Sequence, residues 1–258
     1  MIRYPTFDGT DVTAFMVGEK SSKGAILVIQ EIWGLTNYIK NYSRRLASLG
    51  FLVIAPHLYS RRDEFEIFSQ ENIAMSMRLF FEIPAEKRSD KDSISAVMER
   101  ATPEQREVIT RLMMGRGTLE ERMIKDLAMG YDYVKREFKQ TEFGVVGFCM
   151  GGGLSFRIST RLPFDATVVY YGANPPELSD IMNMKGPMLG LYAGEDPNIN
   201  KGIPDAINSF LKYKKQIELK IYPNTRHAFA NNDGAAYDKA ASEDAWDKAS
   251  SFFRKYLK

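Results

Sequence analysis

The stretch that decides the predicted fold is EFGVVGFCMGGGLSFR at residues 142–157. The apolar run 143–146 is typical of a short buried strand, and glycines surround a single cysteine before residues that favour a helix. Gly147, Cys149 and Gly151 have the spacing G-x-C-x-G, which is that of a nucleophile elbow with sulfur in place of the usual serine oxygen. Glycines suit this turn because residues without a Cβ atom let strand and helix approach closely.

Two interpretations of Cys149 follow from its position. Most lone cysteines are small buried hydrophobes, but a structural cysteine has no use for a glycine-lined turn, so the pattern favours a nucleophile. If the turn forms, the helix after it points free N–H groups and the positive end of its dipole at the sulfur, which favours the thiolate. The backbone N–H of Met150 then becomes a donor to an oxyanion.

Composition and length indicate one α/β domain that acts on a small molecule. A chain of 258 residues can bury a large core, and no linker or repeat divides it, so we expect a single domain over 1–258. The formal net charge of +2 gives no electrostatic case for nucleic acid or an anionic membrane as partner. One cysteine forms no intramolecular disulfide, and the N-terminus lacks an apolar signal segment. We therefore expect a cytoplasmic protein that does not enter the membrane.

Short apolar runs between helical patterns predict a mostly parallel twisted sheet flanked by helices. The turn at Asp8-Gly9 predicts an antiparallel hairpin between 2–7 and 12–17. A strand, a helix and a strand at 24–29, 37–50 and 51–55 predict a right-handed parallel crossover. The other expected elements are a helix from 118 with a capping box of Thr118 and Glu121, strands at 143–146, 166–171, 188–192 and 217–222, a helix at 204–214 and a long C-terminal helix.

The segment 60–117 interrupts this pattern. It contains no buried-strand signal; charged stretches alternate with stretches rich in Met and Phe, which predicts two or three amphipathic helices. We expect such an insertion to lie over the carboxyl edge of the sheet as a lid. Most of its Met and Phe side chains should pack within the insertion, and a few should face a ligand.

Three side chains of catalytic type follow predicted strands. Cys149, Asp196 and His227 occur in the order nucleophile, acid, histidine, which is the chain order of α/β-hydrolases. His227 would exchange a proton with the thiol, and Asp196 would hold the imidazole in the right tautomer. Glu195 is an alternative acid if the turn shifts by one residue. The second histidine, His57, is more typical of a structural loop residue than of a catalytic one.

A carboxylate, Glu31, comes directly after the buried strand 24–29, where α/β sheets place their ligand sites. Its position is equally compatible with a functional acid and with an ordinary solvated loop acid. One cysteine and two separated histidines give no zinc-ligand spacing, so we expect neither a metal nor a cofactor.

Five short segments occur in an order that is known from one family. They are QEIWG at 30–34, APHLYS at 55–60, GFCMGG at 147–152, AGEDP around Asp196 and RHAF around His227. Together they resemble the dienelactone hydrolase (carboxymethylenebutenolidase) family, α/β-hydrolases with a cysteine nucleophile. The resemblance covers most of the chain. It implies Cys149, Asp196 and His227 as the triad, and the backbone N–H groups of Ile32 and Met150 as the oxyanion hole.

The resemblance also implies a role for Glu31. In the family this acid hydrogen-bonds the resting thiol and helps to generate the thiolate when an anionic substrate arrives. A carboxylate beside a thiol opposes its ionisation through like-charge repulsion. The sulfur would therefore stay neutral, and protected from oxidation, until the substrate displaces the acid.

Substrate binding is where the chain departs from the family pattern. Asn231 stands where an arginine commonly binds the lactone carboxylate, and His57 replaces a family acid. The second carboxylate-binding arginine falls in the enlarged segment, where Arg61 and Arg62 compete with Arg78. Loss of a bidentate carboxylate clamp changes substrate choice more than reaction type. The substrate-binding residues that we expect are Trp33, Arg78, Arg226 and Asn231.

The sequence therefore predicts a cysteine-dependent hydrolase of a small ester or lactone that works through a thioester, as a monomer or small homo-oligomer. A general carboxylesterase or thioesterase for neutral esters is the alternative among enzymes, and Asn231 favours it. From another class, a ligand-binding or redox-sensing protein would use Cys149 as an oxidisable thiol. Such a sensor would not need the acid and the histidine.

Overall fold

A computed structural model describes residues 1–20, 22–62, 64–88 and 90–257. The described strands form one sheet in the order β1-β2-β4-β3-β5-β6-β7-β8. The hairpin of β1 and β2 is antiparallel, β2 pairs antiparallel with β4, and the other neighbours are parallel. The predicted α/β-hydrolase fold is thereby confirmed. The strands are β1 (Ile2–Pro5), β2 (Asp11–Val17), β3 (Ala25–Ile29), β4 (Leu52–Pro56), β5 (Phe143–Phe148), β6 (Ala166–Tyr170), β7 (Met188–Glu195) and β8 (Ile217–Arg226).

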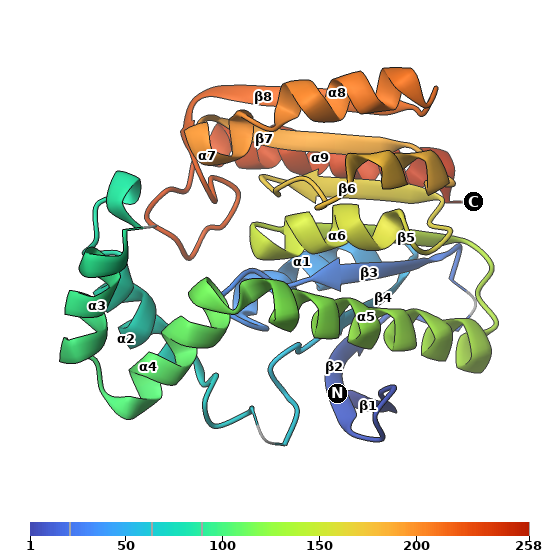
Figure 1. Ribbon diagram of the computed structural model, residues 1–258. Helices are drawn as coiled ribbons and strands as arrows, with labels where there is room; N and C mark the ends of the chain where they lie inside the picture. The colour runs from blue at the N-terminus through green and yellow to red at the C-terminus, as the bar shows by residue number, and fades with distance from the viewer. Residues whose placement is uncertain (21, 63, 89, 258) are drawn as a thin grey trace.

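Helices cover both faces of the sheet (Figure 1). Along the central strand β3, Leu27 and Ile29 point to one face, and Ile26 and Val28 point to the other. Because helices cover both faces, both sets are buried, and the strand reads as an unbroken apolar run. The helices on one face are α1 (Asn37–Ala47) and α9 (Lys239–Tyr256); those on the other are α5 (Arg116–Phe138), α6 (Met150–Ser159) and α8 (Ile203–Lys212), and short segments α7 (Pro197–Asn200) and η3 (Leu178–Asn183) flank the last strands.

The insertion between β4 and α5 forms a separate group of helices beyond the carboxyl ends of the strands, on the left in Figure 1. Buried Met77, Phe80 and Leu112 belong to the same apolar core as α5, so much of the predicted Met and Phe stripe is internal packing. Phe65 and Met114 are exposed. The helical segments are α2 (Gln70–Phe80), η1 (Ala85–Lys87), α3 (Lys91–Arg100), α4 (Pro103–Ile109) and η2 (Thr110–Met114).

The helix after the insertion begins earlier than predicted. Its first residue is Arg116, so Thr118 lies inside the helix and cannot cap it. The side chain of Glu121 pairs instead with arginines of α6 and of the turn after it. The predicted capping box is therefore wrong. A capping box does occur at the start of α4, where Thr102 and Gln105 cap each other.

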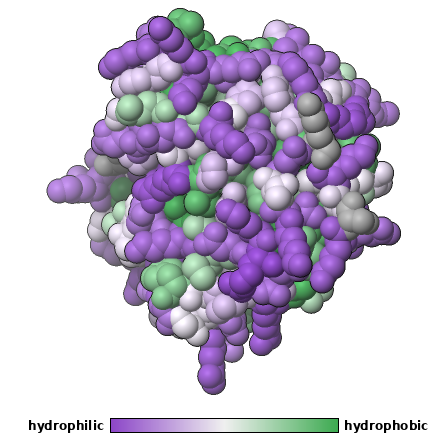
Figure 2. Space-filling model, turned by 90° about the vertical axis from the view of Figure 1, so that its right-hand side faces the viewer, coloured by the Kyte–Doolittle hydropathy of each residue, from purple (hydrophilic) through white to green (hydrophobic). Residues whose placement is uncertain are grey.

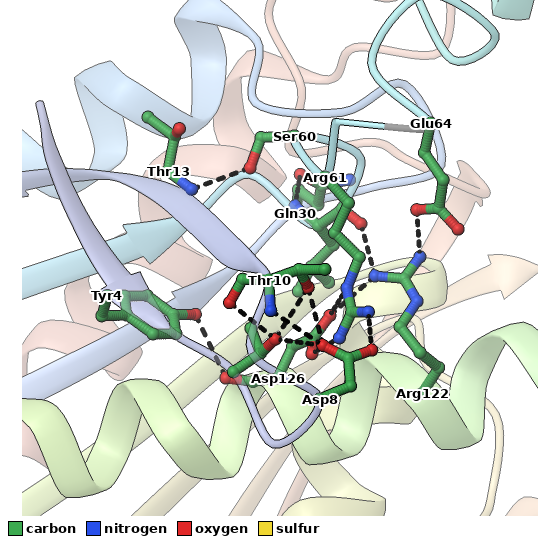
Figure 3. A network of polar contacts seen from close by, with 12 residues as sticks. Tyr4, Asp8, Thr10, Thr13, Gln30, Ser60, Arg61, Glu64, Arg122 and Asp126 are labelled. Atoms are coloured by element: carbon green, nitrogen blue, oxygen red, sulfur yellow. Dashed lines mark hydrogen bonds and ion pairs between the residues drawn. The ribbon is translucent and has the colours of Figure 1, made fainter.

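A buried network of ion pairs joins the insertion to α5 and to the β1–β2 turn (Figure 3). Asp126 on α5 is fully buried, and its Oδ2 accepts hydrogen bonds from Nε of Arg61 at 3.0 Å and from Nη1 of Arg122 at 2.7 Å. Arg61 also contacts Asp8 at 2.5 Å, and Arg122 contacts Glu64 at 2.6 Å. Because the guanidinium of Arg61 is enclosed by carboxylates, it anchors the insertion rather than facing a ligand.

The face opposite the insertion is mostly hydrophilic and shows only small, scattered hydrophobic patches (Figure 2). None of the helices in residues 1–20, 22–62, 64–88 and 90–257 combines the length and the apolar character that a transmembrane span requires.

We expect Asp126→Asn to lower the free energy of unfolding by about 3–5 kcal/mol, because two buried guanidinium groups lose their shared carboxylate. Urea unfolding followed by circular dichroism measures this change. Arg100→Ala is the control: the Arg100–Glu82 pair lies on the same insertion but is exposed, and its loss should cost no more than about 1 kcal/mol. Equal effects of the two substitutions would contradict an anchoring role for the network.

Candidate active site

Cys149 stands on a strained turn between β5 and α6. It is the N-cap of α6, with φ of 55° and ψ of −116°, a conformation that L-residues rarely adopt. A Cβ atom on Gly147 would lie 1.9 Å from the carbonyl oxygen of Gly151, and one on Gly151 would lie 2.3 Å from that of Gln30. These two glycines are needed for the close approach of strand and helix. Gly153 has only ordinary contacts, so its freedom from a side chain is not required there.

Asp196 and His227 follow directly after β7 and β8, and their side chains are hydrogen-bonded. Nδ1 of His227 lies 2.5 Å from Oδ2 of Asp196. Asp196 is buried, whereas its neighbour Glu195 is exposed. The geometry therefore makes Asp196, and not Glu195, the acid that orients the imidazole.

The imidazole of His227 also interacts with Cys149. Burial lowers the pKa of His227, but hydrogen bonds to Asp196 and Cys149, together with the negative charges of both, raise it to about 10. The positive form of the imidazole is therefore favoured at neutral pH. Asp196 and His227 are hydrogen-bonded, and the Cys149 thiol is near enough to the imidazole to raise its pKa, so all three groups lie at the carboxyl edge of the sheet.

Tyr59 contacts both residues of the candidate oxyanion hole. Its hydroxyl donates to the carbonyl oxygen of Ile32 at 3.0 Å and lies 3.8 Å from Sδ of Met150. Met150 begins α6, where the first N–H groups have no partner within the helix. Within the described part of the chain, neither the Ile32 nor the Met150 N–H has a hydrogen-bond acceptor. Both groups are thus free to stabilise developing negative charge.

Glu31 is buried, which excludes the interpretation that it is an ordinary solvated loop acid. Nδ2 of Asn231 donates to its Oε2 at 2.5 Å, and the Tyr171 hydroxyl donates to its Oε1 at 3.5 Å. The family resemblance implies a hydrogen bond between Glu31 and Cys149, but none is found among the described residues. The carboxylate is instead hydrogen-bonded to the amide of Asn231 and the phenol of Tyr171. Burial raises the pKa of Glu31 to about 7, although Asn231, His227 and Tyr171 each lower it.

The four expected substrate-binding residues lie in different surroundings. Asn231 is buried beside Glu31. Arg226 is exposed and donates to a backbone carbonyl oxygen of the following loop. Arg78 is exposed on α2. Trp33, next to the candidate oxyanion hole, lines a shallow cleft of about 350 Å³ together with α2.

Arg116 is a basic residue near the site that the sequence analysis missed. It begins α5, it is exposed, and its Nε lies 2.5 Å from Oε1 of Glu120. Burial lowers the pKa of Arg116, but Glu120 and, to a smaller extent, Cys149 raise it. The sequence offers only an arginine between two glycines, far from every motif. Its nearness to the thiol depends on how the insertion delivers the chain to α5.

The second histidine, His57, lies among aromatic side chains that follow β4. It packs against the rings of Tyr59 and Phe65, and a Cβ atom on Gly34 would touch its Nε2. Burial, followed by the charge of Lys40, lowers the pKa of His57 to about 4, so the imidazole is neutral. The described residues contain no group of three His, Cys, Asp or Glu side chains that could hold a metal ion.

Comparisons with known proteins agree on one family. Residues 12–257 match the sequence model described as "Dienelactone hydrolase family". The chain is 45% identical over 251 residues to the Saccharolobus solfataricus protein named "Putative carboxymethylenebutenolidase", covering 97% of this chain and 96% of that protein.

Solved structures agree on the fold. A "Putative Dienelactone Hydrolase" from Klebsiella pneumoniae has a TM-score of 0.72 at 21% identity and covers 99% of both chains. A dienelactone hydrolase-like promiscuous phosphotriesterase from metagenomic libraries has a TM-score of 0.71 at 17% identity, covering 100% of this chain and 98% of that one. At these identities the similarity supports the fold alone.

The buried acid should make stability depend on pH. The pKa of Glu31 is about 7 in the folded chain, against an ordinary value of 4.5. The free energy of unfolding of the protein should therefore fall as the pH rises from 4.5 to about 7, because the unfolded chain releases this proton first. The difference in free energy of unfolding between Glu31→Gln and the wild type should therefore shift by about 3 kcal/mol in favour of Glu31→Gln across this pH window. Above about pH 7 this difference should stay constant. Urea unfolding at a series of pH values measures the difference.

A second variant tests the cause. Asn231→Ala removes a hydrogen bond that lowers the pKa of Glu31, so the upper end of the window should move to higher pH. A difference between Glu31→Gln and wild type that does not vary with pH would contradict the raised pKa.

Proposed function

Because this chain belongs to the dienelactone hydrolase family, whose members hydrolyse ester and lactone bonds, we propose that it cleaves a small ester or lactone through a thioester on Cys149. The observation that supports this most directly is the hydrogen bond from Asp196 to His227, whose imidazole also interacts electrostatically with Cys149. A thiolate of this kind must stay reduced, so we also propose a cytoplasmic location.

In the first half of the proposed reaction, the Cys149 thiolate attacks the acyl carbon and a C–S bond forms. The electron pair of the carbonyl moves to its oxygen, and the N–H groups of Ile32 and Met150 stabilise that negative charge. When the tetrahedral intermediate collapses, the C–O bond to the leaving group breaks. The alkoxide or enolate takes the proton of the His227 imidazolium, which Asp196 keeps oriented.

In the second half, the neutral His227 takes a proton from water, and the oxygen of that water attacks the thioester. The same two N–H groups stabilise the second oxyanion. The C–S bond then breaks, which returns the thiolate beside the imidazolium and releases the carboxylic acid. The cycle needs no group beyond the three side chains, the two N–H donors and water.

The contacts of Asn231 and Arg116 bear on substrate choice. The amide of Asn231 is engaged by Glu31, and it carries no charge with which to hold a substrate carboxylate. This favours the alternative of a neutral ester as substrate. Arg116, however, places a positive charge within electrostatic reach of Cys149. We propose Arg116 as the cation that faces the carboxylate of an anionic lactone.

An acyl-enzyme experiment tests the proposed nucleophile. With p-nitrophenyl acetate, intact-mass spectrometry should show one acetyl group per chain, peptide mapping should locate it on Cys149, and turnover should follow. His227→Gln should lower kcat by at least roughly 10³-fold, and Cys149→Ala should show no acylation while unfolding at the wild-type temperature. A thiol that oxidises but is never acylated would instead support the redox sensor.

A comparison of two substrates tests the role of Arg116. With a dienelactone, Arg116→Ala should raise KM about tenfold, because a charge-assisted contact to the carboxylate is lost. A neutral aryl ester of similar size should show no change in KM. Arg78→Ala and Arg226→Ala serve as matched arginine variants. Preference for the neutral ester in the wild type and in all three variants would identify a general carboxylesterase.

A further inference from the structure

A second cavity lies behind the candidate active site, between α1, α9 and the loop after His227. It has a volume of about 160 Å³, and none of Cys149, Asp196 and His227 lines it. The side chains that decide its chemistry are Tyr38, Tyr42, Tyr170, Tyr237, Trp246 and Arg45. The cavity therefore has aromatic walls, a single cationic side chain, and the polar side chains of Asn41, Asn232 and Ser242 among its lining residues.

The aromatic walls are held in place by one another. Tyr42 meets Trp246 edge-on with ring centroids 5.1 Å apart, and it meets Tyr170 in the same way at 6.0 Å. The Tyr42 and Tyr170 hydroxyls lie 3.3 Å apart, and the Tyr170 hydroxyl donates to a backbone carbonyl oxygen of α9 at 3.0 Å. Such a cavity is formed before any ligand arrives. A cavity of about 150 Å³ is large enough for benzene, so this cavity of about 160 Å³ has room for one aromatic ring.

Arg45 gives the cavity its charge. Its guanidinium lies 3.8 Å from the ring centroid of Trp246. Its charge acts on Tyr38 and Tyr42, which form the inner wall. In the described parts of the chain, no carboxylate forms an ion pair with Arg45. A guanidinium over an indole ring and without an acidic partner offers its N–H groups to an anion.

We propose that this cavity binds a small aromatic carboxylate. The ring of the ligand packs between the tyrosines and Trp246, where edge-on and stacked contacts are favourable. Its carboxylate pairs with Arg45 at the mouth of the cavity. An organic cation is excluded by the positive charge of Arg45, and a neutral ring gains only the aromatic contacts. None of the three triad residues lines the cavity, so the proposal does not depend on the reaction that the protein catalyses.

Benzoate and benzamide test the proposal as a matched pair of anionic and neutral probes. In a Trp33→Phe background, Trp246 is the only indole of the chain, so its fluorescence reports on the cavity. Benzoate should change this fluorescence in a saturable manner. Benzamide should bind about tenfold more weakly, because it lacks the charge-assisted contact. Arg45→Gln should weaken benzoate binding to the level of benzamide and leave benzamide binding unchanged.

Two controls make the outcome decisive. Arg45 is exposed, so Arg45→Gln should keep the wild-type circular dichroism spectrum and unfolding temperature. Alkylation of Cys149 with iodoacetamide should leave benzoate binding unchanged, because the thiol does not line this cavity. The proposal is overturned if Trp246 fluorescence does not saturate with benzoate, if Arg45→Gln binds benzoate as tightly as before, or if alkylation abolishes binding.

Discussion

The close approach of β5 to α6 is the constraint on which the candidate site depends. Strand and helix are so close at Gly147 and Gly151 that no side chain fits between them. The chain must turn sharply at Cys149 to pass from the strand to the helix. The same packing brings the backbone of Gly151 against the carbonyl oxygen of Gln30. One contact therefore positions the sulfur, the first N–H groups of α6 and the loop that carries Glu31 and Ile32.

The insertion is connected to this constraint through the segment after β4. The backbone N–H of Leu58 donates to Oε1 of Gln30 at 3.1 Å, and Arg122 donates to the carbonyl oxygen of Leu58 at 2.9 Å. Next along the chain, Tyr59 contacts both Ile32 and Met150. The ion pairs around the buried carboxylate of α5 and the two candidate oxyanion donors thus share one short segment, residues 58–59, which connects the insertion to the site.

Local patterns were sufficient to predict the sheet, the elbow and the order of thiol, acid and histidine, because each depends on a few neighbouring residues whose steric needs are visible in the sequence. The partners of Glu31 were not predictable in this way. Asn231 is 200 residues away, and Tyr171 follows a different strand. The charge of Arg116 near the thiol and the inward turn of Tyr59 likewise depend on tertiary packing. At Thr118 the local pattern was misleading. Thr118 and Glu121 have the spacing of a capping box, but α5 begins two residues before Thr118, so this residue cannot cap the helix.

The ion pairs that Asp126 makes with two arginines have a consequence for behaviour at high temperature. Removing charged groups from water becomes less unfavourable on heating, because their hydration carries a strongly negative entropy. Apolar contacts gain no comparable advantage, since their contribution for each unit of area reaches a plateau. On heating, the ion pairs that join the insertion to the sheet should therefore be lost later than the apolar packing around them. Thermal unfolding should begin in the outer helices of the insertion while the insertion remains attached to the rest of the domain.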